Sequence, residues 1–179
     1  MDIEQILKEA AESGNVTKYS LKSVDSLEED VRQALIKLIA RGGKSSNALR
    51  TALIAKEFPR EIVDQMIARF IEVSLIDDFA LARDLVEMAV TRKAKAKSVI
   101  ARELAEKGIP KDAIEAALSE IDQDTELEAA KLIAEKRIRQ LLKLEPDVRQ
   151  RRLAGFLSRK GYSSSVVWAA VRFATEQVT

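Results

Sequence analysis

An internal repeat constrains the fold of this chain more than any other sequence feature. Three stretches align when 51 and then 53 are added to the residue numbers, and each shows the same order of apolar and polar positions. The matching positions are Leu53, Lys56, Phe58, Glu61, Val63 and Ile67; Leu104, Lys107, Ile109, Asp112, Ile114 and Leu118; and Leu157, Lys160, Tyr162, Ser165, Val167 and Val171. A period near 50 residues indicates a supersecondary unit that buries its apolar face against neighbouring copies. The pattern therefore predicts a tandem array rather than one catalytic globule.

The composition favours helices and a location in the cytoplasm. Of 179 residues only 4% are aromatic, with six Gly and three Pro, so turn-forming residues are scarce and helix formers dominate. We predict an all-α fold. No apolar run reaches the roughly 20 residues that span a bilayer, and the start of the chain carries acids, unlike a signal peptide. We expect a cytoplasmic protein that does not enter the membrane.

Most enzyme chemistry lacks its usual residues here. The chain contains no Cys and no His, which excludes disulfides, thiol nucleophiles, imidazole catalysis and the usual zinc sites. Asp77 and Asp78 are adjacent acids without a third partner, a pattern more typical of helix caps than of metal ligands. We expect no catalytic residues, no metal site, no cofactor and no enzymatic activity.

Capping residues predict where the helices begin. Ser26 with Glu29, and Thr125 with Glu128, have the spacing of capping boxes. Gly42 and Gly43 are expected to end the first helix, and Ser45 or Ser46 to cap the next. An Asp of the pair at residues 77–78 is placed to cap a further helix.

The repeated turns differ from one another. Gly108 can end a helix in the left-handed conformation before Pro110 starts the next one, and Gly161 has the same place in the third repeat. Glu57 has this place in the first repeat, so that turn either differs from the others or carries left-handed strain on the order of 1 kcal/mol. Trp168 lies in the last helix, where we expect core or terminal packing rather than stacking on bases.

The net charge is only +1, but the charges are segregated along the chain. Residues 1–30 hold eight acids and three bases, and residues 112–128 hold seven acids and no base. Residues 92–111 hold seven bases and two acids, and residues 131–160 hold ten bases and three acids. Such segregation can present a positive face to a polyanion or an acidic partner. Solvated helix faces explain the charges equally well.

Three motifs have a specific order and spacing along the repeats: the junction Leu75-Ile76-Asp77-Asp78-Phe79-Ala80, the element Glu103-Leu104-Ala105-Glu106-Lys107-Gly108-Ile109 and the unit 152–171. Together they resemble the RecX family, bacterial regulators of the RecA recombinase. The resemblance covers residues 27–174, and the order and spacing of its motifs are more specific than any one of them. Gly42-Gly43 and Glu57 depart from the family pattern.

The resemblance implies an elongated, curved array of three tandem three-helix repeats that restrains RecA. The expected parts are a short N-terminal extension, 1–25, and repeats at 26–76, 77–123 and 124–179. Members of the family bind RecA filaments on single-stranded DNA and inhibit ATPase, strand exchange and coprotease activity in DNA repair, homologous recombination and the SOS response. We expect a monomer with the RecA filament as partner. The alternative is a helix-turn-helix-type protein that binds single- or double-stranded DNA directly.

Two basic clusters are the candidate contact sites for RecA or DNA. Arginine binds phosphate or carboxylate groups with two parallel hydrogen bonds, which favours a binding role over a solvated helix face. For the first cluster the functional and solvated interpretations remain about equal. The candidate residues are Arg92, Lys93, Lys95 and Lys97, and Arg149, Arg151, Arg152, Arg159 and Lys160.

Overall fold

The structure, a computed structural model, describes residues 23–178 and confirms an all-helical fold for that range. The side chains of Arg92 and Gln123 lie outside the described set, as does the expected N-terminal extension up to residue 22. Contacts divide the described residues into two compact units. The first contains residues 23–81 and 107–110, and the second contains residues 82–106 and 111–178.

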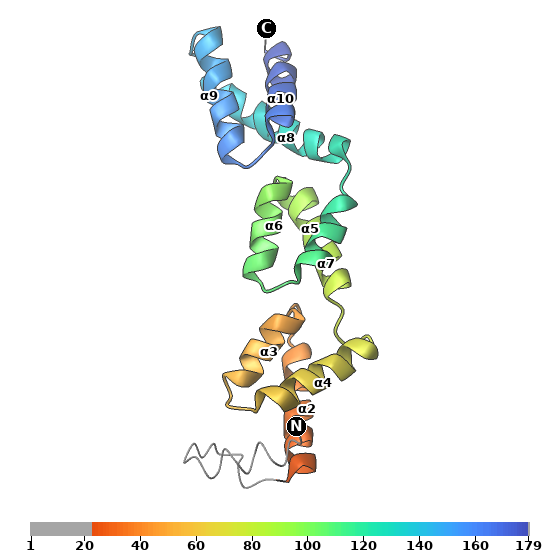
Figure 1. Cartoon of the computed structure of the whole chain (residues 1–179). Coiled ribbons are helices and arrows are strands. Elements are labelled where there is room, and N and C mark those ends of the chain that lie inside the picture. The colour runs from red at the N-terminus through yellow and green to blue at the C-terminus, as the bar shows by residue number, and fades with distance from the viewer. Residues whose placement is uncertain (1–22, 179) are drawn as a thin grey trace. The chain divides into compact units, whose positions relative to one another are not determined.

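The first unit is built on three helices packed around one core. These are α2 (Val24–Ile39), α3 (Ser46–Ile54) and α4 (Arg60–Glu72), each of which contacts the other two (Figure 1). Their buried apolar residues recur at helical spacing, as one face of each helix must to reach a shared core. The fully buried members include Leu27, Leu35, Leu53, Ile62 and Ile67.

The second unit contains most of the remaining helices. α5 (Asp78–Lys93) begins in the first unit and belongs to the second from Ala82 onward. α6 (Lys97–Glu106) packs on α7 (Lys111–Ser119). α8 (Gln123–Ile138), the 3-10 helix η1 (Arg139–Leu141), α9 (Pro146–Arg159) and α10 (Ser164–Glu176) follow. α8, α9 and α10 pack against one another, and α8 and α10 share the largest contact (Figure 1).

Both expected capping boxes were wrong, because each helix begins earlier at another acceptor. Ser23 caps α2 by accepting a hydrogen bond from the Ser26 backbone, and Asp122 caps α8 by accepting one from the Thr125 backbone at 2.6 Å. Hydrogen bonds from Thr125 also lower the pKa of the Asp122 carboxyl. A cap needs only an oxygen that reaches the orphan N–H groups of the first turn, so an earlier Ser or Asp can extend the helix.

Other helix ends follow the sequence predictions. Ser45, one of the two expected serines, caps α3 through the backbone N–H of Ala48 at 3.2 Å. Asp77 accepts a hydrogen bond from the Ala80 backbone at 2.8 Å, at the start of α5. Gly108 has φ 73° and Gly161 has φ 89°, both left-handed as expected. Glu57 also adopts the left-handed conformation, with φ 69°, and so carries the expected backbone strain.

The two glycine turns are seated on the first residues of earlier helices. In the first unit, Asn47 Nδ2 donates to the Gly108 carbonyl at 3.0 Å, and Ser45 Oγ donates to the Lys107 carbonyl at 2.8 Å. In the second unit, Ser98 Oγ donates to the Gly161 carbonyl at 2.7 Å. We call each arrangement a turn contact. Side-chain donors thereby satisfy carbonyls that a helix end leaves without a partner.

Tyr162 adds an anchored aromatic ring to the second turn contact. Its side chain is buried, and its hydroxyl donates to the Ala94 carbonyl at 2.5 Å. Burial raises the pKa of Tyr162 to about 12, so the hydroxyl keeps its proton at neutral pH. The ring belongs to the same core as Ala96, Leu157 and Val167. The buried ring thereby fills the space beside its turn.

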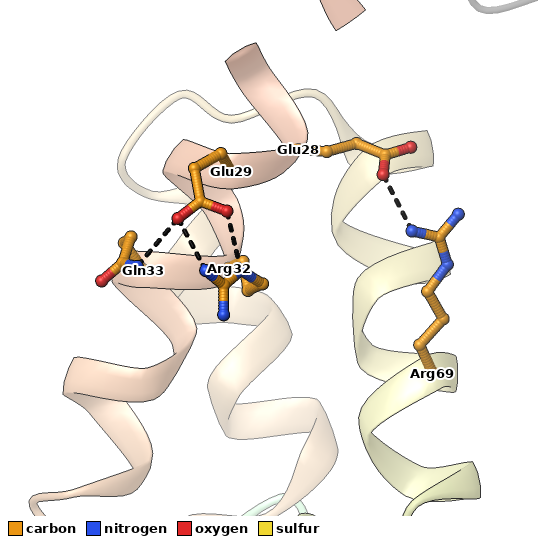
Figure 2. A network of polar contacts seen from close by, with 5 residues as sticks. All are labelled: Glu28, Glu29, Arg32, Gln33 and Arg69. Carbon is orange, nitrogen blue, oxygen red and sulfur yellow. Dashed lines mark hydrogen bonds and ion pairs between the residues drawn. The ribbon is translucent and has the colours of Figure 1, made fainter. Parts of the chain in front are cut away.

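Polar contacts along α2 also join this helix to the last turn of α4 (Figure 2). Arg69 on α4 donates to Glu28 on α2 at 2.8 Å. Within α2, Arg32 donates twice to Glu29, at 2.7 and 2.8 Å, and Gln33 donates to the same carboxylate at 2.8 Å. The hydrogen bond from Arg32, followed by that from Gln33, lowers the pKa of Glu29 to about 2.

Replacing Gly161 by Ala should destabilise the second unit strongly. A Cβ at this position would lie 2.6 Å from Ser98 Oγ and 2.8 Å from Val99 Cγ2, in a backbone with φ 89°. Overpacking of 1–3 kcal/mol together with left-handed strain near 1 kcal/mol predicts a loss of about 2–4 kcal/mol in urea unfolding. Gly43→Ala is the matched control, because its Cβ would meet nothing within 4 Å and only strain remains. Equal losses in the two variants would show that the turn contact is not tightly packed.

The Glu29 contacts should be visible in an acid titration. A carboxylate with a lowered pKa stabilises the fold fully above its unfolded value near 4.5, and loses that contribution as the pH falls toward 2. We expect the Glu29 side-chain carboxyl resonance to titrate near pH 2 by NMR. In Arg32→Ala, which removes the strongest donor, the midpoint should rise toward 4.5. An unchanged midpoint would mean that the arginine does not control this group.

Candidate functional site

The first basic cluster lies where α5 ends and α6 begins. Lys93 is the last residue of α5 and is exposed, whereas Ala96 is completely buried. Ala94 between them is left-handed, with φ 44°, and its carbonyl accepts the Tyr162 hydroxyl. The connection is therefore held by the turn contact of the second unit. Its backbone is shaped by packing as well as by charge.

Two lysines of this cluster bind groups of their own unit. Lys95 forms an ion pair with Glu103 on α6, and its hydrogen bond is the main cause of the lowered pKa of Glu103. The Lys97 ammonium donates to the Ile121 carbonyl, and the Lys97 backbone N–H donates to Glu126 at 3.2 Å. The expected cluster is thus not a set of parallel free cations. Lys93 is its exposed described member.

Arg149 of the second cluster anchors α9 to the segment before it. One guanidinium nitrogen donates to the Leu144 carbonyl at 3.2 Å and to the Leu142 carbonyl at 3.5 Å. Its Nε atom is buried without a hydrogen-bond partner among the described residues. Arg149 therefore has a positioning role within the second unit, which sequence spacing alone could not indicate.

The remaining members of the second cluster form an exposed basic face on α9. Arg151, Arg152 and Arg159 point away from the buried residues of this helix, since they are exposed whereas Leu153 and Leu157 are fully buried. Residues 151, 152 and 159 lie within about 100° of one another at 100° per residue. The guanidinium groups of Arg151 and Arg152 form no hydrogen bond or ion pair with the described residues. We call these three residues with Lys160 the α9 basic face.

Phe156 joins the edge of the α9 basic face to α8. The Lys160 ammonium lies 5.8 Å from the centre of its ring, and the Arg137 guanidinium lies 5.1 Å from it. Cations over aromatic rings are attracted by the ring quadrupole at such distances. Arg137 is partly buried and also donates to Gln140. No sequence signal linked it to Phe156, because the contact crosses between helices.

The first unit contains a separate groove between α2 and α4. It has a volume of about 370 Å³ and lies beside the polar contacts of Figure 2. Its lining residues are Asp25, Glu28, Glu29, Arg32, Met66, Arg69, Phe70 and Val73. The Glu28 and Glu29 carboxylates both accept hydrogen bonds from arginines, so their charges are balanced within the unit. The groove is thus a mixed polar and apolar surface.

Three further sequence expectations concern a metal site, membrane-spanning helices and the packing of Trp168. Among residues 23–178, no group of three or more acidic, His or Cys residues is arranged to hold a metal ion. None of the helices in that range is long and apolar enough to cross a membrane. Trp168 does not belong to the core as expected, because 49% of its surface is exposed on α10. The buried face of α10 is formed by smaller residues instead.

Comparison with protein families identifies two segments of the chain. Residues 77–118 match the family model described as RecX, second three-helix domain. Residues 124–171 match the model described as RecX, third three-helix domain. The α9 basic face lies within the second of these segments.

Solved structures of RecX proteins are also similar to this chain. A crystal structure of RecX from Lactobacillus salivarius matches with a TM-score of 0.80 at 18% identity, over 84% of this chain and 98% of the other. A second RecX crystal structure matches with a TM-score of 0.70 at 24% identity, over 78% and 69%. At these identities the likeness concerns the fold.

Sequence relatives extend the likeness beyond the fold. Regulatory protein RecX of Thermobifida fusca is 29% identical over 141 residues, 79% of this chain and 76% of the relative. Regulatory protein RecX of Streptomyces coelicolor is 36% identical over 149 residues, 83% of this chain and 79% of the relative. With this identity over most of both sequences, the chain belongs to the RecX family.

Proposed function

We propose that this protein is a negative regulator of the RecA recombinase. It binds RecA filaments on single-stranded DNA and inhibits their ATPase, strand-exchange and coprotease activities. Membership of the RecX family is the observation that carries this proposal, since relatives of this chain are named regulatory proteins. The protein acts by binding rather than by catalysis.

The α9 basic face supports a binding role. Its arginines are exposed, and the guanidinium groups of Arg151 and Arg152 form no ion pair with the described residues. A guanidinium presents several N–H donors in a fixed plane, which suits carboxylates of a protein or phosphates of a nucleic acid. Lys95 and Lys97, by contrast, bind groups of their own unit. We therefore propose α9, in preference to residues 92–97, as the site that contacts the partner.

The proposal includes the organisation of the chain. The repeats extend over residues 26–76, 77–123 and 124–179, and helices that begin at Val24, Asp78 and Gln123 support these boundaries. The protein is a cytoplasmic monomer with the RecA filament as its partner.

Titration into a RecA reaction tests the proposal. RecA on single-stranded DNA with ATP should lose ATPase activity and strand exchange as this protein approaches the RecA concentration. Binding to the filament should reduce both activities together, because both require the assembled filament. The control is this protein with ATP and DNA but without RecA, which should release no phosphate. Unchanged RecA rates at equimolar protein would contradict the proposal.

Direct action on DNA is the alternative that the same surface allows. Binding through phosphates releases counterions, so affinity for naked DNA would fall steeply and linearly on a logarithmic salt scale. We expect binding to filaments to exceed binding to naked DNA at 150 mM salt. Equal affinity for the two would favour the alternative.

A further inference from the structure

The repeat places the arginines of α9 where the other two repeats carry a turn contact. Asn47 plus 51 gives Ser98, and Ser98 plus 53 gives Arg151, by the offsets that align the repeats. Asn47 and Ser98 both donate to the carbonyl of a turn glycine, Gly108 or Gly161. Arg151 thus occupies the position of a side-chain donor that is used in both earlier repeats.

The residues beside this position also match one another between the repeats. A Cβ on Gly108 would approach Ser45 at 3.2 Å and Ala48 at 3.6 Å, in addition to Asn47. A Cβ on Gly161 would approach Val99 at 2.8 Å and Ala96 at 3.6 Å, in addition to Ser98. Adding the offset of 51 to positions 45 and 48 gives 96 and 99, and adding 53 to these gives 149 and 152. The seat for a turn in the third repeat is therefore formed by Arg149, Arg151 and Arg152.

The third seat differs from the first two in shape and in charge. α3 begins at Ser46, which corresponds to residue 150, but α9 begins four residues earlier at Pro146. The backbone N–H groups at this seat are therefore already inside a helix, as the bond from Arg149 to the Glu145 carbonyl shows. The donors available at this seat are therefore those of the side chains, and arginine reaches further from the helix than Ser or Asn does.

Of these three arginines, two have free guanidinium groups. Arg149 is bound to the Leu142 and Leu144 carbonyls. Arg151 and Arg152 are exposed, and their guanidinium groups form no hydrogen bond or ion pair within residues 23–178. Neutral side chains that donate to a turn carbonyl in the first two seats are thus replaced by two positive charges in the third. The positive charge selects a partner that carries negative charge as well as carbonyl oxygens.

We propose that Arg151 and Arg152 bind an acidic turn at the end of a helix in a partner protein. Both occupied seats hold a left-handed turn that ends a helix, so the third seat is expected to take a polypeptide of that shape. Helix ends expose carbonyl oxygens with partial negative charge, and an Asp or Glu beside them completes the match to the two guanidinium groups. This inference rests on the proposed function, in which the partner protein is RecA in its filament.

Charge reversal at the seat tests the inference. The variant Arg151→Glu/Arg152→Glu should bind RecA filaments on single-stranded DNA at least about tenfold more weakly than the wild type, because like charges then face each other. The matched control is Lys143→Glu/Arg172→Glu, which changes the charge equally at two exposed positions of the same unit. This control should change the dissociation constant less than about twofold, as rim charges typically do. Circular dichroism and thermal unfolding establish that both variants are folded.

The outcomes separate the inference from the function on which it rests. Absence of wild-type binding to filaments would overturn both. Wild-type binding that the seat variant retains at the level of the control would overturn only the inference. Equal loss of affinity for filaments and for naked single-stranded DNA in the seat variant would also overturn it, because phosphates would then be the ligand. We expect naked-DNA binding of the two variants to be equal.

A crosslink can identify what the seat contacts. The chain has no Cys, so Ser158→Cys introduces one reactive thiol, exposed and on the same side of α9 as Arg151. Seven residues along a helix correspond to about 10 Å, within reach of a photoactivated label on that thiol. Mass spectrometry should find the label attached to RecA peptides with Asp or Glu at a helix end. Attachment to DNA alone would overturn the proposal.

Discussion

The seating of a glycine turn on the start of an earlier helix is the constraint on which the rest of this structure depends. Gly161 has a left-handed backbone and lacks a Cβ, and a Cβ there would come within 2.6 Å of Ser98 Oγ. Ser98 supplies the hydrogen bond, and Tyr162 fills the adjoining core and binds the Ala94 carbonyl. One turn thus fixes residues more than 60 positions apart. The connection from α5 to α6 takes its shape from this contact.

Electrostatics divides the basic residues into two groups with different roles. Lys95, Lys97 and Arg149 neutralise a carboxylate or bind carbonyl oxygens of their own unit. Such partly buried pairs are structural, because removing one partner leaves the other without a hydrogen bond. Arg151 and Arg152 have no such partner in the described range, so their donors are available to another molecule. Sequence density of charge could not separate these groups, since every member lies in a basic stretch.

Sequence reasoning predicted the helices, the turns and the family, and it missed features that depend on contacts across the fold. The left-handed Gly108 and Gly161 followed from their place after an apolar helix, because few residues adopt that conformation. The capping boxes failed, since earlier acceptors at Ser23 and Asp122 compete for the same N–H groups. Trp168 proved exposed, because smaller residues already fill the buried face of α10.

The sequence by itself determined an all-helical array with a period near 50 residues and a left-handed glycine turn in the second and third repeats. Periodic apolar positions and backbone preferences are local, so they can be recognised without coordinates. Only the tertiary structure decided which charged side chains bind groups of their own unit and which residues form a seat for a turn. Those outcomes depend on distances between segments such as 94–98 and 161–162, which packing brings together. The repeat register links sequence and tertiary structure, because it aligns Arg151 of the third repeat with the side chains that donate to a turn carbonyl in the other two.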